Sequence, residues 1–208
     1  MKQDRERWNA KFDDQRDMGE ASQWVRNMHK MAPGPKVLDL AAGQGRNAAF
    51  LARQGYKVLA LDLSDRAVHR LKAHNIPGLV PVQADLDTFP LREESFDLIV
   101  CCFFLDRRLF PFIKEGLKPG GILLYESAME SDQPSISQPG NRDYLFRTNE
   151  LLHSFLSLRV ISYQEVVFRD GKGDGQNRVV ARLAAQKGWT GDAPLVRNSD
   201  QSGIDGCL

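Results

Sequence analysis

The amino-acid sequence predicts an α/β fold, a doubly wound sheet with helices packed against it. Short apolar runs alternate along the chain with helical or loop segments, the order expected of parallel strands joined by crossovers. The first run passes through a glycine turn directly into a helical segment, at residues 36–47. The fourth run, residues 96–105, is continuously apolar and suits a central parallel strand covered on both faces.

Two helices are predicted ahead of this sheet. Residues 4–17 alternate in charge and place Trp8 and Phe12 one helical turn apart. Residues 20–31 carry apolar side chains, among them Trp24, at amphipathic spacing before a Pro-Gly-Pro stop. Two interpretations are open: the aromatic residues dock these helices on the domain, or the first segment also closes over a bound ligand as a lid.

The glycine turn has the composition of a nucleotide cradle. Gly43 and Gly45 let the backbone approach a ligand closely, and the free N–H groups at the start of the next helix, residues 46–54, attract negative charge. Asp39 lies at the end of the preceding strand, residues 37–40, where ligands bind in open α/β sheets. This stretch therefore predicts the centre of a ligand site.

A second carboxylate follows one strand–helix–strand unit later. Asp62 ends the strand at residues 57–61, about where a dinucleotide-binding fold holds a ribose. Its two oxygens suit two adjacent ribose hydroxyls. The alternative is that Asp62 only favours the start of the helix at residues 65–74, which Ser64 is placed to cap. We interpret Asp62 as a ribose-binding residue.

Three further segments complete the predicted parallel part of the sheet. The strand at residues 79–83 contains Pro81, which indicates an edge position or a strand start, because proline cannot donate to the ladder. After the fourth strand, residues 107–117 are predicted to be helical. Residues 118–121 (Lys-Pro-Gly-Gly) then form a sharp turn, and residues 122–126 form the fifth strand.

The C-terminal part of the chain is less regular. Residues 128–147 are rich in Ser, Pro, Gln and Gly, and loops of this length inside compact domains are usually functional or disordered. A short helix restarts at Thr148, and the runs at 159–168 and 177–184 predict a β-hairpin around a glycine-rich tip. Residues 185–208 are polar with scattered glycines, and we expect a disordered tail.

Composition excludes several classes of protein. A formal net charge of +1, with 42% hydrophobic and 26% charged residues, predicts a soluble domain without a general attraction to nucleic acid or anionic membranes. The three cysteines give neither a disulfide framework nor metal-ligand spacing, and Cys101 and Cys102 are expected to be buried, inert thiols. With no signal-peptide pattern at the polar N-terminus, these features favour a cytoplasmic protein without a metal site.

Five motifs within residues 36–126 resemble the class I S-adenosylmethionine (SAM) dependent methyltransferases. An acid four residues before the first glycine distinguishes their turn from the nicotinamide-binding form, and here Asp39 precedes Gly43 by four. Ala41 stands where glycine is commonest in the family. In chain order the motifs are Asp39-Leu-Ala-Ala-Gly-Gln-Gly, Leu61-Asp62-Leu63, Ala84-Asp85-Leu86, the Phe-Asp strand at 96–100 and the Leu-Lys-Pro-Gly-Gly turn at 117–121.

Further likeness points to a group of small bacterial methyltransferases near the tellurite-resistance and thiopurine enzymes. It lies in Trp8-Asn-Ala-Lys-Phe, in Gly45-Arg-Asn and the residues after it, and in Tyr144-Leu-Phe-Arg-Thr-Asn-Glu. The resemblance implies a Rossmann-like sheet of seven strands in the order 3-2-1-4-5-7-6, with strand seven antiparallel. It also implies a single domain over residues 1–184, with residues 1–33 as N-terminal helices or lid and 185–208 as the tail.

The same resemblance implies which residues bind SAM. The turn would hold the methionine part, Asp62 the ribose, and Asp85 with Leu86 the adenine, although Asp85 read alone could be a surface carboxylate beside Asp87. The residues after the fourth strand would border the methionine end and the methyl group. The implied cofactor-binding set is Asp39, Ala41, Gly43, Gly45, Asn47, Asp62, Leu63, Asp85, Leu86, Cys102 and Phe103.

The methyl acceptor is less defined by the sequence. Arginines near the methyl group would suit an anionic acceptor or lower the pKa of a thiol, although Arg107 and Arg108 could equally be solvated residues at a helix start. None of the four histidines has an indicated partner as a base. The candidate acceptor-binding residues are Trp8, Phe103, Asp106, Arg107, Arg108, Tyr125, Tyr144 and Arg147.

Three functions remain open from sequence. The first is methyl transfer to a small molecule, through sulfur or another soft nucleophile. The second is methylation of a protein or RNA, for which neither a basic face nor a recognition domain is evident. The third is a SAM-binding regulator without turnover, or a different Rossmann-type enzyme. The sequence gives no indication of the oligomeric state.

Overall fold

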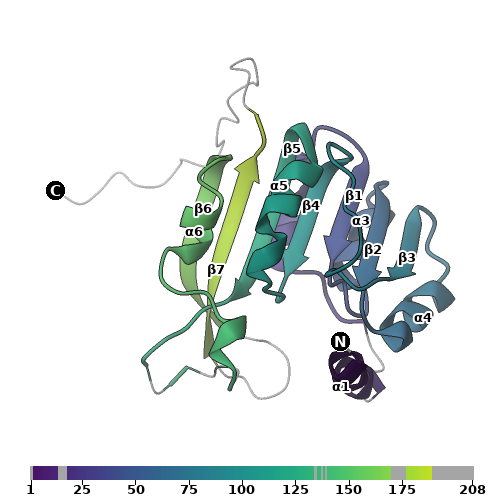
Figure 1. Cartoon of the computed structure of the whole chain (residues 1–208). Coiled ribbons are helices and arrows are strands. Elements are labelled where there is room, and N and C mark those ends of the chain that lie inside the picture. Colours follow the sequence, from purple (N-terminus) through teal and green to yellow (C-terminus); the bar gives the residue numbers. More distant parts are fainter. Residues whose placement is uncertain are drawn as a thin grey trace, which may run out of the picture.

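The computed structural model describes residues 2–13, 18–133, 135–136, 138, 140–169 and 177–188. Seven strands form one sheet in the order β3-β2-β1-β4-β5-β7-β6, as predicted (Figure 1). Strands β1 to β5 are parallel, whereas β7 is antiparallel to both neighbours. The strands are β1 (Lys36–Leu40), β2 (Lys57–Asp62), β3 (Leu79–Gln83), β4 (Phe96–Cys102), β5 (Leu117–Ala128), β6 (Arg159–Arg169) and β7 (Asn177–Gln186).

Helices cover both faces of this sheet. One face packs against α5 and α6 through an aromatic core, and the other packs against α2, α3 and the inner side of α4. None of the described helices has the length and apolar composition needed to span a bilayer. The helices are α1 (Lys2–Asp13), α2 (Gln23–Met28), α3 (Arg46–Arg53), α4 (Asp65–Ala73), α5 (Phe110–Gly116) and α6 (Glu150–Ser154), with 3-10 turns at His29–Met31, Arg107–Leu109 and Arg142–Tyr144.

Local signals in the sequence account for most element ends. The Ser64 hydroxyl accepts the N–H of Ala67 and caps α4, as predicted. Gly55, at φ +92°, follows the end of α3 in a left-handed conformation that other residues rarely adopt. Pro81 lies in β3, an edge strand of the sheet, which confirms the edge prediction. Trp24 is buried against the α3 face and docks α2.

The predicted boundaries of the fourth and fifth strands are wrong. The fourth strand ends at Cys102, not at residue 105, because Phe103 turns to φ +56° and its N–H donates to the Glu126 carbonyl oxygen. The predicted turn at residues 118–121 lies inside β5 as a bulge, since Phe96 pairs with Leu117 while Leu98 pairs with Ile122.

The predicted C-terminal hairpin is confirmed as β6 and β7. β7 continues to Gln186, two residues past the predicted end, whereas the glycine-rich tip at 170–175 and residues 189–208 of the predicted tail lie outside the described residues. The ends of the long loop after β5 are joined by a parallel bridge between Met129 and the buried Phe146. This bridge brings the loop back over the edge at which the parallel strands end.

Candidate functional site

The glycine turn after β1 is held in an unusual backbone conformation. Ala41, Gly43 and Gly45 all have positive φ, at +51°, +56° and +81°. The Ala42 N–H donates to the Leu61 carbonyl oxygen, which ties the turn to the end of β2. Strained residues often cluster at binding sites, and here they place the first N–H groups of α3 against the ends of β1 and β2.

Asp39 is a buried carboxylate beside this turn. Its side chain is only 2% exposed, and its Oδ2 atom has no hydrogen-bond partner in the structure. Burial raises the pKa of Asp39 to about 7, although a hydrogen bond from the Ala48 N–H and the nearby Arg46 guanidinium act in the opposite direction. A buried oxygen without a donor is a place for a cationic ligand group, and the α-ammonium of SAM fits it.

Asp62 already binds backbone groups on both sides of the site. Its Oδ2 accepts the Gly43 N–H at 2.6 Å and its Oδ1 accepts the Ser64 N–H at 2.8 Å. Burial raises the pKa of Asp62, and the N–H groups of Ser64, Gly43 and Leu63 oppose that rise. Three N–H groups do not use all four lone pairs of the two oxygens, so the carboxylate can also accept a ribose hydroxyl while it fixes the turn.

The predicted adenine-binding residues lie in the loop that follows β3. The Asp85 Oδ1 atom accepts the Asp87 N–H at 3.1 Å, and the Asp85 carbonyl accepts two further N–H groups of this loop. Leu86 is half-buried against the core. The Ala84 N–H donates to the Asp62 carbonyl, so this loop is joined directly to the end of β2.

Arg46, Cys102 and Phe103 lie together at the end of β4. The Arg46 guanidinium lies 5.4 Å from the centre of the Phe103 ring, and no carboxylate of the described residues lies within ion-pair distance of it. Burial raises the pKa of the Cys102 thiol, with the Glu126 and Asp39 carboxylates adding to the effect. The thiol therefore stays protonated, and Arg46 is the available cation, a residue that sequence reasoning did not single out.

The first helix lies along the site. In Figure 1, α1 lies beside α4 at the edge where the parallel strands end. The Asn9 side chain bonds Ser64 Oγ at 2.6 Å and Asp65 Oδ1 at 2.8 Å. A Cβ atom on Gly43 would lie 3.2 Å from the Phe12 ring, so that ring rests against the turn.

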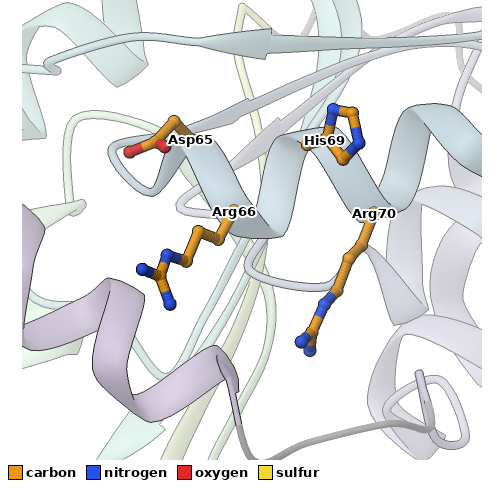
Figure 2. Close-up of a pocket in the computed structure, with 4 residues that line it drawn as sticks. All are labelled: Asp65, Arg66, His69 and Arg70. Carbon is orange, nitrogen blue, oxygen red and sulfur yellow. The ribbon is translucent and has the colours of Figure 1, made fainter.

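An open hollow of about 340 Å³ lies on the outer side of α4. Asp65, Arg66, His69 and Arg70 line it, and Figure 2 shows both arginine side chains extending from the helix on the side where α1 lies. Arg70 donates to the Phe12 carbonyl oxygen. The side of this hollow that carries the arginines is therefore part of the contact between α1 and α4.

Two predicted acceptor-binding residues do not fit that role. Tyr125 is 1% exposed in the aromatic core on the α5 face, and its hydroxyl donates to the Phe104 carbonyl. Arg107 forms a bidentate pair with Glu150, at 2.5 and 3.0 Å, and donates to the carbonyls of Asp143 and Leu145. Its donors are engaged in holding the loop after β5.

Of the other acceptor candidates, Arg108 is engaged in ion pairs, whereas Tyr144 and Arg147 are exposed. Arg108 pairs with Asp106 and Asp87, both at 2.6 Å, and joins the loops after β3 and β4. Tyr144 is 39% exposed, and its hydroxyl accepts from Arg7 at 3.1 Å. The Arg7 guanidinium lies 5.5 and 5.6 Å from the ring centres of Trp8 and Tyr144, which links α1 to the loop after β5. The Arg147 side chain is exposed.

A buried polar cluster beside the site was missed by sequence reasoning. Glu126, near the end of β5, is 2% exposed and bonds both Ser22 and Arg182. Asn47, predicted to bind the cofactor, uses its Oδ1 atom to accept the Ser22 N–H at 2.9 Å. The sequence did carry a signal for this residue, because Glu126 follows an apolar strand segment as Asp39 and Asp62 do.

Gly45 offers a direct test of the geometry of the turn. An alanine Cβ there would lie 2.4 Å from Leu71 Cδ2, and alanine would have to adopt φ +81°. We expect Gly45→Ala to lower the free energy of unfolding by about 2–4 kcal/mol, from backbone strain plus overpacking. Gly55→Ala, at φ +92° with nothing within 4 Å, should lose only about 1 kcal/mol. Equal losses in urea denaturation would contradict the close Gly45–Leu71 contact.

Comparison with known proteins agrees with this geometry. Residues 37–121 match the family model described as a methyltransferase domain. A Synechocystis protein named "Uncharacterized methyltransferase sll0829" is 35% identical over 99 residues, which cover 44% of this chain and 46% of that protein. The "Phthiotriol/phenolphthiotriol dimycocerosates methyltransferase 1" of Mycobacterium ulcerans is 30% identical over 113 residues, 50% of this chain and 42% of that protein.

A third relative is similar in both sequence and structure. The Haemophilus influenzae protein named "Probable S-adenosyl-L-methionine-dependent methyltransferase TehB" is 29% identical over 160 residues, 72% of this chain and 55% of that protein. The crystal structure of TehB superposes with a TM-score of 0.71 at 25% identity, over 86% of this chain and 67% of the TehB chain. The chain spans about half the length of these three curated relatives.

Proposed function

This chain carries a class I SAM-dependent methyltransferase domain related to TehB, and from this premise we propose that it transfers the methyl group of SAM to a small-molecule acceptor, such as a thiol or another soft nucleophile. The observation that carries the proposal is the partnerless, buried Oδ2 atom of Asp39 beside the glycine turn. A small acceptor is supported by the Mycobacterium ulcerans relative, whose name gives phthiotriol and phenolphthiotriol dimycocerosates, not a protein or a nucleic acid, as what it methylates.

Each end of the cofactor has a set of residues that fits it. Asp39 would accept from the α-ammonium group, and Arg46 would pair with the α-carboxylate, since it is the cation beside Asp39 that lacks a carboxylate partner among the described residues. Asp62 would accept from the ribose hydroxyls, and Asp85 with Leu86 would border the adenine.

When bound, SAM supplies a methyl group on a positively charged sulfur, already activated for displacement. The protein then has to orient the acceptor and exclude water, which accounts for much of the rate in such reactions. Phe103 and Cys102, at the end of β4, would border the methyl group, while Trp8 and Tyr144 would line the acceptor side. Since the thiol of Cys102 is kept protonated, we assign it no role as a nucleophile.

We infer that α1 acts as a lid. Asn9 lies on Ser64, Phe12 rests against Gly43, and Arg7 bonds Tyr144 across the acceptor side. Ser64 is bonded to the Asp62 carboxylate, Gly43 belongs to the turn and Tyr144 is a candidate acceptor-binding residue, so these contacts adjoin the groups assigned to the ribose, the methionine part and the acceptor. The helix would therefore have to move for the cofactor to exchange, and in the closed position it would keep water out.

Incubation of the purified protein with methyl-labelled SAM tests this function. We expect label in small acceptors from a panel of thiols, amines, phenols and oxyanions, and no increase when RNA or protein is added. Asp39→Asn is the matched inactive control. Transfer only to RNA or protein would favour the macromolecular alternative. If SAM binds and no panel member or macromolecule is labelled, the site is better explained as that of a SAM-binding regulator.

A further inference from the structure

Glu126 is the shared partner of several groups at the methionine end of the site. Its Oε1 atom accepts the Ser22 hydroxyl at 2.9 Å, and its Oε2 atom accepts Arg182 Nε at 2.7 Å. Its backbone carbonyl accepts the Phe103 N–H at 2.7 Å. Both carboxylate oxygens thus accept a hydrogen bond from another segment, so Glu126 is placed to hold other residues.

The position of Glu126 follows from the register of the sheet. Asp39 pairs with Val100, which pairs with Leu124, and all three lie on the face covered by α2 and α3. Glu126 lies two residues beyond Leu124 and pairs with Cys102 on one side and Arg182 on the other. Because alternate residues of a strand share a face, Glu126 lies on the same face as Asp39, farther toward the ligand edge.

The contacts continue from Glu126 to the residues assigned to the cofactor. Ser22, bonded to the Glu126 carboxylate, donates its own N–H to Asn47 in the first turn of α3. Asn47 adjoins Arg46, whose guanidinium lies over the Phe103 ring. Glu126 therefore holds Phe103 through its backbone and reaches the neighbour of Arg46 through its side chain.

We propose that Glu126, fixed by Arg182, is a positioning residue that sets Arg46 against Phe103 through Ser22 and Asn47, and so shapes the site for the methionine end of SAM. This inference rests on the proposed function. It gives the buried ion pair a role in ligand affinity beyond its role in the fold. It also anchors Ser22, which is the N-cap residue of α2 and follows α1 in the chain.

The sheet contains a second buried ion pair that serves as a control. Asp97, at the opposite end of β4, is 5% exposed, pairs with Lys118 Nζ at 2.8 Å and accepts the Lys36 N–H at 2.9 Å. A purely structural role for Glu126 predicts that the two pairs behave alike on substitution. A positioning role predicts that only the Glu126 pair affects the affinity for SAM.

Calorimetric titration of the full chain with SAM, together with thermal melting, separates these cases. We expect Glu126→Gln and Ser22→Ala each to raise the Kd for SAM about tenfold, and the double variant to raise it about tenfold as well, because both act through one contact. Asp97→Asn should lower Tm and leave Kd within about twofold. Ser22→Ala removes only a hydroxyl group, whose other contact is the N-cap bond from the Trp24 N–H. Thermal melting reports the loss of that cap, while the titration tests the inference even if Glu126→Gln does not fold.

Three results would overturn the inference. These are Kd values within about twofold of the unmodified protein in Ser22→Ala, a double variant whose Kd rises by the product of the two single effects, or an Asp97→Asn variant that loses as much affinity as Glu126→Gln. If the unmodified protein itself does not bind SAM, the proposed function fails and the inference fails with it. Binding that is intact in the unmodified protein and unchanged in the variants rejects the inference alone.

Discussion

Replacement of Asp39 by asparagine is expected to weaken SAM binding by about 100-fold or more and, at the same time, to stabilise the free protein at alkaline pH. The loss of affinity follows because asparagine has no charge to offer an ammonium group in a buried site, where removing one partner of an ion pair costs about 3–5 kcal/mol. The gain in stability follows because the free protein buries this carboxylate with one oxygen unpaired.

The pH dependence of that gain has a defined sign. The pKa of Asp39 is about 7 in the folded protein against an ordinary 3.8, mainly because of burial. Between these values the folded protein holds a proton that the unfolded chain has released, so the free energy of unfolding falls as the pH rises from 3.8 to about 7. The Asp39→Asn variant lacks this fall. Its free energy of unfolding should exceed that of the unmodified protein by about 1–3 kcal/mol at pH 8, and this difference should shrink toward pH 4.

Two measurements check the Asp39 prediction. Thermal melts of both proteins at several pH values should show the curves converging in acid. The Kd for SAM of the unmodified protein should rise about tenfold between pH 8 and pH 6, because protons compete with the ammonium group for Asp39, while the weak binding of Asp39→Asn should not show this dependence. A variant that is less stable at every pH would mean that the carboxylate chiefly anchors the Ala48 N–H.

The second large effect is expected at Asp62. Alanine there should lower SAM affinity by about 100-fold and also lower the free energy of unfolding by about 2–4 kcal/mol, because the N–H groups of Gly43, Ser64 and Leu63 lose their acceptor. The bonds to the turn add a structural role, so the folded variant should have a loosened glycine turn.

Asp62→Asn is the matched comparison for this prediction. Its single amide oxygen can accept from one of the two flanking segments, so its stability should fall between those of the unmodified protein and Asp62→Ala. Urea denaturation and calorimetric titration with SAM measure the two effects separately. If Asp62→Ala binds SAM with unchanged affinity, the assignment of Asp62 to the ribose is wrong, whatever the change in stability.

Sequence reasoning predicted those parts of the fold that local chemistry determines. Short-range patterns that the structure reproduces predict Asp39 next to the end of β1, the end of β2 at Asp62, the capping Ser64, the edge position of Pro81 and the hairpin. The strand order was expected only from the family resemblance, because the order depends on pairing between distant segments.

The acceptor side was harder to predict because it depends on long-range contacts. Tyr125 and Glu126 are neighbours in one strand, so only one of them can face the α2–α3 side, and the choice depends on register with β1 and β4. Arg107 is bound by groups 36 to 43 residues away in the chain, at Asp143, Leu145 and Glu150. No local pattern around Arg107 reveals that its donors are already engaged.

Calorimetric titration of the unmodified protein with SAM, S-adenosylhomocysteine, NAD and NADP tests the central claim most directly. We predict micromolar binding of the two adenosyl ligands, with no binding of either nicotinamide dinucleotide, because Asp39 and Arg46 fit an amino-acid end that NAD and NADP lack. Binding of NAD or NADP without SAM would contradict the assignment of the turn around Gly43, and the methyltransferase account would fail with it.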